Sequence, residues 1–174
     1  MAKPKPLPPV ETLREYFSYD PETGVLSLKK SFNHNGLRVG QPLGYKNSQG
    51  YLRLCFKGER YLVHRIVWTL MTGKEPVQEI DHANRDKADN RWANLRACSR
   101  AENRANRETW GKFLPGAHKN SCGITWTSSG NGKRLVNFAT EKEAHDAYVK
   151  WHREHYGEFS VYAAPSSSLG LDAG

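Results

Sequence analysis

The chain has few cysteines, and their spacing matches no common metal or disulfide pattern. Cys55, Cys98 and Cys122 are far apart in 174 residues, and no two of them form a C-x-x-C pair. A disulfide framework or a structural zinc site needs more cysteines, at shorter spacings. We therefore expect neither. Cys55 and Cys98 lie in strand-like runs, so we expect both to be buried as small hydrophobic residues.

The chain also lacks a long apolar run. No stretch approaches the roughly 20 apolar residues of a membrane-spanning helix. The segment 1–9 is basic and rich in proline, and it has no hydrophobic core of a secretory signal. These features predict a cytoplasmic type of chain with no membrane partner.

Acidic residues are outnumbered by basic ones. The chain has 26 Lys and Arg against 18 Asp and Glu, a formal net charge of +8 and a pI of about 9.5. Such a chain is attracted to polyanions, and its binding should weaken steeply with salt. Charge alone does not distinguish DNA from other polyanions. The length suits one medium domain or two small ones.

The residue types with the clearest chemistry are Asp81 and His82. Asp81 is a hard oxygen ligand suited to a magnesium-like ion, whereas the side chain of His82 titrates near neutral pH and can accept a proton. Neighbouring side chains on a strand point to opposite faces, so we expect the chain to bend at this pair. The run from His82 to Asn94 is rich in Asn and Asp and is typical of a loop.

The residues after this loop predict a strand and then a helix. Residues 94–98 can return as a second short strand, and the S-x-x-E run from Ser99 to Glu102 predicts a capped helix that starts at Ser99. Asn103 then lies in the first turn of the helix, near the carboxylate and the imidazole. Arg107 falls one turn further along the same face. The pattern predicts a strand, a loop, a strand and a helix around one ion.

These residues resemble the HNH nuclease family, in the branch found in phages and homing endonucleases. The resemblance rests on the Asp81-His82 pair, Asn94-Leu95-Arg96, the helical Glu102-Asn103, and a segment that runs from Gly50-Tyr51 to His64-Arg65-Ile66-Val67-Trp68. It covers Tyr19 to Arg107. It implies a ββα-metal nuclease core and hence an α+β fold.

The resemblance also implies a role for each site residue. His82 would be the general base that activates a water, Asp81 and Asn103 would hold one divalent ion, and Asn94 would brace the loop and the orientation of His82. The substrate would be double-stranded DNA, with no small-molecule cofactor beyond the metal. The products would be a 5′-phosphate and a 3′-hydroxyl. Activity should rise as the pH passes through the pKa of the base, at roughly 6 to 8.

Three residues near this site invite separate interpretation. The colicin DNases carry histidines on the helix and bind a softer ion, whereas this helix offers Asn103, which favours Mg²⁺ or Mn²⁺ over Zn²⁺. Arg107 is interpreted as a phosphate contact or as a solvated helix residue. His64 is either a packing residue beneath the site or a contact to a metal ligand or a phosphate.

Patterns elsewhere predict the remaining elements of the nuclease region. Residues 10–19 form a short helical or irregular segment, and residues 25–28 form a strand. We expect residues 29–49 to form a loop or an irregular hairpin. Residues 51–56 and 60–63 then make a hairpin, which leads into a short helix with an apolar face.

A second, smaller unit follows a linker at 108–115. We expect it to be a small three-stranded sheet with one helix. Strands at 124–127 and 134–139 flank a turn that contains Asn131-Gly132, and the T-x-x-E run at Thr140 opens a helix that ends before Gly157. This unit resembles the DNA-binding domain of plant ethylene-response factors. Its DNA-binding candidates are Lys119, Trp126, Lys133 and Arg134, with sheet packing the alternative for Trp126. Base-specific reading stays open.

The sequence thus predicts an α+β chain with a lead at 1–9, an HNH domain at 10–107, a linker at 108–115, a DNA-binding domain at 116–162 and a tail at 163–174. The favoured function is a metal-dependent DNA endonuclease of the phage homing type, acting as a monomer in the cytoplasm of a bacterial host. One alternative is a catalytically silent DNA-binding or regulatory protein. The other is a structure-selective or nonspecific phage nuclease.

Overall fold

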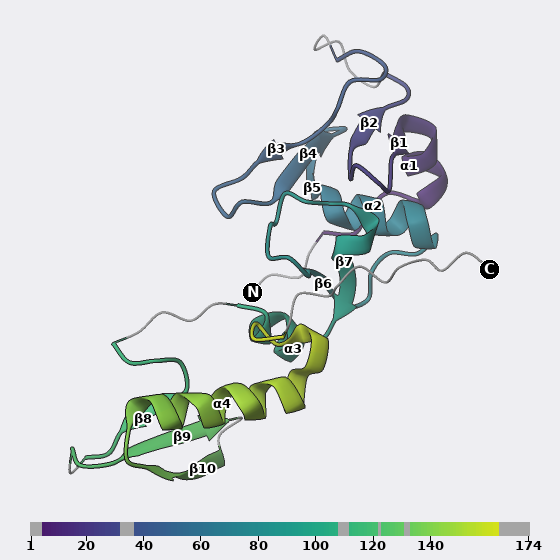
Figure 1. Ribbon diagram of the computed structural model, residues 1–174. Helices are drawn as coiled ribbons and strands as arrows, with labels where there is room; N and C mark the ends of the chain where they lie inside the picture. The colour runs from purple at the N-terminus through teal and green to yellow at the C-terminus, as the bar shows by residue number, and fades with distance from the viewer. Residues whose placement is uncertain (1–4, 32–36, 108–111, 122, 131–132, 164–174) are drawn as a thin grey trace. The chain divides into compact units, whose positions relative to one another are not determined.

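The computed structural model describes residues 5–31, 37–107, 112–121, 123–130 and 133–163. It divides the chain into two compact units, Met1–Arg100 and Ala101–Gly174. Both contain small antiparallel sheets and short helices, which confirms the predicted α+β class (Figure 1). The division falls seven residues before the predicted end of the nuclease domain at Arg107, so the predicted domain boundaries stay a prediction.

The first unit opens with a helix and a strand pair. Helix α1 (Val10–Tyr16) is followed by β1 (Phe17–Tyr19), which pairs antiparallel with β2 (Leu26–Leu28). The predicted segment 10–19 is therefore a helix over its first part only. The helix ends because Phe17 takes an extended conformation, in which its side chain is buried with those of β2.

A three-stranded sheet comes next, in the order β3-β4-β5. Its strands are β3 (Tyr45–Lys46), β4 (Leu52–Phe56) and β5 (Glu59–Leu62). This confirms the predicted hairpin. Leu54 and Phe56 point into the core, so the alternation of a strand turns Cys55 outward. The expectation of a buried Cys55 was wrong, whereas Cys98 is buried.

Helix α2 (Val63–Thr72) contacts α1, β4 and β5 and closes the core of the first unit (Figure 1). Ile66 and Val67 are fully buried, as the apolar spacing predicted. The helix ends at Gly73, which has a left-handed conformation with φ of 75°. No helix in the described part of the chain has the length and apolar character needed to cross a membrane.

The two strands predicted around the Asp/Asn-rich loop are present. β6 (Glu79–His82) pairs antiparallel with β7 (Leu95–Cys98), and the short helix η1 (Trp92–Asn94) lies at the end of the loop between them. The bend expected at Asp81-His82 was wrong by one residue, because the strand continues through His82 and the turn begins at Ala83. Both side chains of the pair are buried, one on each face of the ribbon.

Helix α3 (Arg100–Ala105) begins one residue after Ser99, and all of it except Arg100 belongs to the second unit. The helix is shorter than expected, so Arg107 lies beyond its end and not one turn further along it. Asn103 and Asn106 help to explain the early end, since asparagine side chains compete for backbone hydrogen bonds and favour turns over helix.

The rest of the second unit is a sheet with one helix. Its strands are β8 (Ala117–Lys119), β9 (Trp126–Gly130) and β10 (Lys133–Phe138), in the order β10-β9-β8. They are followed by α4 (Glu141–Tyr156) and η2 (Gly157–Phe159). The predicted three strands and helix are therefore observed, although β9 extends through residues 128–130 and β10 begins at Lys133, all of which were assigned to the turn.

Helix α4 lies along one face of this sheet (Figure 1). It begins at the predicted capping box, in which the Thr140 side chain accepts from the Glu143 backbone N–H. Gly116 and Gly130 face Tyr148 and Trp151 so closely that a Cβ would come within 2.0 and 2.3 Å of their rings. Both glycines are therefore required for the helix to approach the sheet.

The turn between β1 and β2 generates a test of how the first unit is packed. Gly24 has φ of 73°, and a Cβ there would lie 2.5 Å from the Arg91 nitrogen and 2.7 Å from the Asn90 carbonyl carbon. Gly40 has φ of 83° and nothing within 4 Å. Gly40→Ala should cost only the left-handed strain, about 1–2 kcal/mol. Gly24→Ala should cost about 1–3 kcal/mol more, because backbone must move. Equal losses in denaturant unfolding would contradict this contact.

Candidate active site

Asp81 is held by an arginine on the neighbouring strand. Asp81 and Arg96 are directly opposite each other in the β6–β7 register, and Arg96 donates from Nε and Nη2 to Asp81 Oδ2 at 2.9 and 2.8 Å. Asp81 is 6% exposed. A buried carboxylate is costly unless it is paired and hydrogen-bonded. Arg96 therefore supplies a partner for the buried carboxylate of Asp81 and fixes its orientation.

His82 has a different partner. Its Nε2 lies 3.2 Å from Oδ1 of Asn90, which is itself 2% exposed. Burial lowers the pKa of His82, although the hydrogen bond to Asn90 and the nearby Asp81 and Asp89 act in the opposite direction. The net lowering leaves the imidazole neutral at pH 7. A neutral imidazole is the form that can accept a proton.

His64 packs directly against His82. Their ring centroids are 5.2 Å apart, with the planes at 82°, and Tyr51 contacts both rings. His64 Nδ1 is buried without a hydrogen-bond partner among the described residues. Burial, with smaller contributions from His82 and Arg65, lowers the pKa of His64 to about 3. These contacts favour the packing interpretation of His64, and a contact to a metal ligand or phosphate stays a prediction.

Asn94 holds the two ends of the loop together. Its Oδ1 accepts from the Asn84 backbone N–H at 2.9 Å, and its Nδ2 donates to the Asp89 carbonyl at 2.8 Å. Its own carbonyl accepts from the Ala83 N–H at 2.9 Å. Asn94 therefore links the start of the loop, just after β6, to its later part, just before β7. A bracing residue would make such contacts, and the part of Asn94 in catalysis stays a prediction.

Side chains of the loop support one another. Asn84 Nδ2 donates to Asp89 Oδ2 at 2.7 Å, and Arg91 donates to both oxygens of Asp89. The hydrogen bond from Arg91 is the main cause that lowers the pKa of Asp89 to about 2. Asp86 accepts from the Ala88 N–H at 3.0 Å. The loop is therefore a folded structure with its own network.

The remaining predicted residues of the site lie in the second unit. Asn103 is on α3, and Arg107 follows that helix. The role of Asn103 beside Asp81 and the phosphate contact of Arg107 stay predictions. Within the described residues, no three His, Cys, Asp or Glu side chains are grouped so that they could hold a metal ion.

Sequence reasoning assigned no role to Asn90 or Arg96. Arg96 could have been found, because the register that pairs His82 with Leu95 places Arg96 opposite Asp81. Nothing in the sequence distinguished Asn90 from the other asparagines of the loop. Its importance depends on its burial against His82, which only the folded chain shows.

The DNA-binding candidates of the second unit lie on two faces of the sheet. Arg134 pairs with Ser129 and is exposed on the face opposite to α4, where its Nη2 donates to Asn137 and, at 3.5 Å, to Asn120. Trp126 is on the other face by alternation and packs against Phe113.

This placement favours the packing interpretation of Trp126. Lys119 is paired with Trp126 in the sheet, and its Nζ lies 5.8 Å from the Trp126 ring centroid. The side chain of Lys133 lies outside the described residues. DNA binding by these four candidates stays a prediction.

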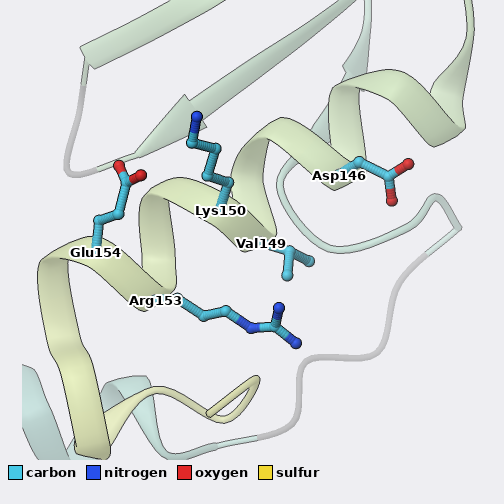
Figure 2. A pocket seen from close by; sticks show the side chains of 5 residues that line it. All are labelled: Asp146, Val149, Lys150, Arg153 and Glu154. Carbon is cyan, nitrogen blue, oxygen red and sulfur yellow. The ribbon is translucent and has the colours of Figure 1, made fainter. Parts of the chain in front are cut away.

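A surface pocket of the second unit lies along α4 and is unrelated to these candidates. Figure 2 shows its lining, which comes from one side of the helix and carries both signs of charge: Asp146, Val149, Lys150, Arg153 and Glu154. Arg153 Nε donates to the Tyr162 carbonyl at 2.6 Å. None of the predicted site residues lines this pocket.

One comparison with known proteins matches the segment that contains the candidate site. Residues 61–105, from β5 to the end of α3, match a family model described as HNH endonuclease. A solved structure described as "DNA binding and cleavage by the HNH homing endonuclease I-HmuI" is similar at 21% identity, over 87% of this chain and 93% of that chain, with a TM-score of 0.44. No curated protein matches the chain. The family match ends before β8, so the resemblance of the second unit to ethylene-response factors stays a prediction.

The buried His64 predicts a pH dependence of stability. Its pKa is about 3 in the folded chain and ordinarily 6.5, so between these values the unfolded chain binds a proton that the folded chain does not. Its contribution is complete above pH 6.5 and is lost as the pH falls toward 3. In His64→Phe, the free energy of unfolding should fall less steeply over this range, by up to about 1.4 kcal/mol per pH unit. Parallel curves from urea unfolding at several pH values would refute this.

Proposed function

We propose that this protein is a metal-dependent DNA endonuclease of the HNH type. The observation that carries the proposal is the pair of adjacent buried groups at the end of β6, a carboxylate paired with Arg96 and a neutral imidazole. The pair lies within the segment that matches the HNH endonuclease model. A carboxylate that can hold a divalent ion and a neutral base supply two functions that metal-assisted hydrolysis of a phosphodiester uses.

In the proposed reaction, His82 accepts a proton from a water molecule, which attacks the phosphorus in line with the leaving 3′ oxygen. The bond between phosphorus and the 3′ oxygen breaks, and the leaving oxygen takes a proton from solvent. The lowered pKa of His82 keeps this base unprotonated at neutral pH. Asn94 holds the loop beside it. Arg107 would contact a phosphate. The products would be a 5′-phosphate and a 3′-hydroxyl.

The donor chemistry of Asp81 and Asn103 fits a magnesium-like ion. Mg²⁺ commonly takes one or two carboxylates and completes its coordination with waters and substrate phosphates. Asp81, with Asn103 from α3, would supply oxygen ligands of this kind, and Mn²⁺ fits the same donors. The ion, when bound, would stabilise the negative charge that develops on the leaving oxygen.

The charge of the chain supports double-stranded DNA as the substrate. A net charge of +8 favours a polyanion, and Arg134 is exposed on a sheet face that is otherwise rich in hydroxyls and amides. One active constellation per chain makes strand nicking by a monomer the simplest outcome. A phage-encoded homing role would account for a nuclease joined to a second DNA-binding unit.

One observation favours a catalytically silent DNA-binding protein as the second candidate. Asp81 Oδ2 accepts two hydrogen bonds from Arg96, and a guanidinium competes with a cation for the same carboxylate. Plasmid cleavage with and without EDTA separates the two functions. A structure-selective or nonspecific nuclease would share the chemistry and differ only in the distribution of its cleavage sites.

The base is tested by removing its imidazole. With Mg²⁺, the wild-type chain should convert supercoiled plasmid to open-circle or linear DNA, and EDTA should stop the reaction. His82→Ala should cut about 10²–10⁴ times more slowly yet bind DNA equally well in a gel-shift assay. His155→Ala removes an imidazole from the second unit and should cut like the wild type. Undiminished cutting by His82→Ala would remove this residue from the mechanism.

The proposed DNA contact of Arg134, on the face of the β10-β9-β8 sheet opposite to α4, is tested by removing its charge, with a matched control. Arg134→Ala should weaken DNA binding and reduce the slope of log K against log salt concentration by about 1, since one phosphate contact is lost. Lys142→Ala removes the same charge from α4, where Lys142 is paired with Asp146, and should leave both quantities unchanged. Equal effects of the two substitutions would mean that only net charge matters.

A further inference from the structure

We infer that Asn90 is a positioning residue that holds His82 in the tautomer with hydrogen on Nε2, and that the turn 19–24 fixes Asn90 in place. The inference rests on the proposed function for its catalytic meaning, since it identifies Nδ1 of His82 as the atom that accepts the proton. The geometry of the hydrogen bond can be tested without any cleavage.

The carboxamide of Asn90 has only one orientation that satisfies its surroundings. Its Nδ2 donates to the Ala88 carbonyl at 3.4 Å, so its Oδ1 faces the imidazole. A carboxamide oxygen only accepts hydrogen bonds. The hydrogen in this contact must therefore come from His82 Nε2, which leaves the lone pair of a neutral imidazole on Nδ1.

Burial strengthens the preference of His82 for the tautomer with hydrogen on Nε2. Asn90 is 2% exposed and His82 is 3% exposed. In the opposite tautomer, the lone pair of Nε2 would face the oxygen of Asn90, and two buried acceptors would lie together without a hydrogen. An unsatisfied buried acceptor is disfavoured much more strongly than an exposed one, because water cannot replace the missing donor.

The turn between β1 and β2 supports the backbone of Asn90 from outside the loop. The Tyr19 hydroxyl donates to the Asn90 carbonyl at 2.7 Å, and the Pro21 carbonyl accepts from the Trp92 N–H at 3.0 Å. Gly24 lies against residues 90 and 91 with no space for a side chain. Three separate contacts therefore place one short turn against the segment that carries Asn90.

Tyr19 is suited to a permanent hydrogen bond. Burial, with smaller contributions from nearby carboxylates, raises the pKa of Tyr19 to about 12. The hydroxyl therefore keeps its hydrogen over the working range of pH. The loop is then held by its own residues Asn84, Asp89 and Asn94 and, from outside, by the turn 19–24. Asn90 contacts both this turn, through its carbonyl, and His82, through its side chain.

The test is the tautomer of His82 in the metal-free full-length chain, measured by long-range ¹H–¹⁵N correlation after labelling of the histidines. The sample is held at about pH 9, where imidazoles are neutral, and His82→Gln identifies the signal. In the wild type, Nε2 should show the shift of a protonated ring nitrogen and Nδ1 that of an unprotonated one. The reverse pattern would overturn the inference.

Substitutions separate the hydrogen bond from simple packing. Asn90→Leu has a similar size but no acceptor, so His82 should become a mixture of tautomers, and kcat for plasmid nicking should fall about tenfold or more with KM little changed. Asn90→Asp keeps an acceptor and should restore the Nε2–H tautomer. Asn84→Ala weakens the same loop without touching His82 and should leave the tautomer unchanged.

Each outcome decides the question. An unchanged tautomer in Asn90→Leu would reject the role of Asn90, as would an equal change in Asn84→Ala. If Asn90→Leu fails to fold by circular dichroism, the wild-type and Asn90→Asp spectra still decide. If the wild type cuts no DNA with any divalent ion, the proposed function fails, while the tautomer measurement still accepts or rejects the hydrogen bond.

Discussion

Burial of two polar side chains at the end of β6 is the constraint on which the first unit depends. Removing one partner of a buried ion pair, or of a buried hydrogen bond, leaves a group that is expensive to keep away from water. Arg96 on β7 meets this requirement for Asp81, and Asn90 in the loop meets it for His82. The strand register and the loop conformation are both restricted by the need to bring these partners into place.

Much of this fold could be predicted from local patterns. The hairpin β4–β5, the buried face of α2 and the two strands around the loop follow from the alternation and periodicity of apolar residues. The beginning of α4 follows from its capping box. In each case, the pattern that indicates the structure lies among residues close in sequence. The resemblance that pointed to Asp81 and His82 depended on similar short spacings.

The parts that could not be predicted depend on contacts between distant residues. Tyr19 and Asn90 are 71 residues apart, and no local pattern indicates that the turn 19–24 touches the loop. No local pattern indicates that Gly24 is special either, although its neighbours in space exclude any side chain. Cys55 was misplaced for a different reason, because the alternation of Leu54 and Phe56 on one face of β4 already places Cys55 on the other face.

The alternation of a strand also explains how neighbouring residues can have opposite electrostatic requirements. A metal ligand must be ionised, whereas a general base must be neutral. In a flexible loop, Asp81 and His82 could face the same side, and the carboxylate would then favour protonation of the imidazole. On β6 they face opposite sides, where a guanidinium stabilises the charge of one and a neutral carboxamide accepts from the other. Burial then lowers the pKa of His82 despite the carboxylate beside it. The ribbon is therefore suited to this pair because it separates their surroundings while keeping them adjacent in the chain.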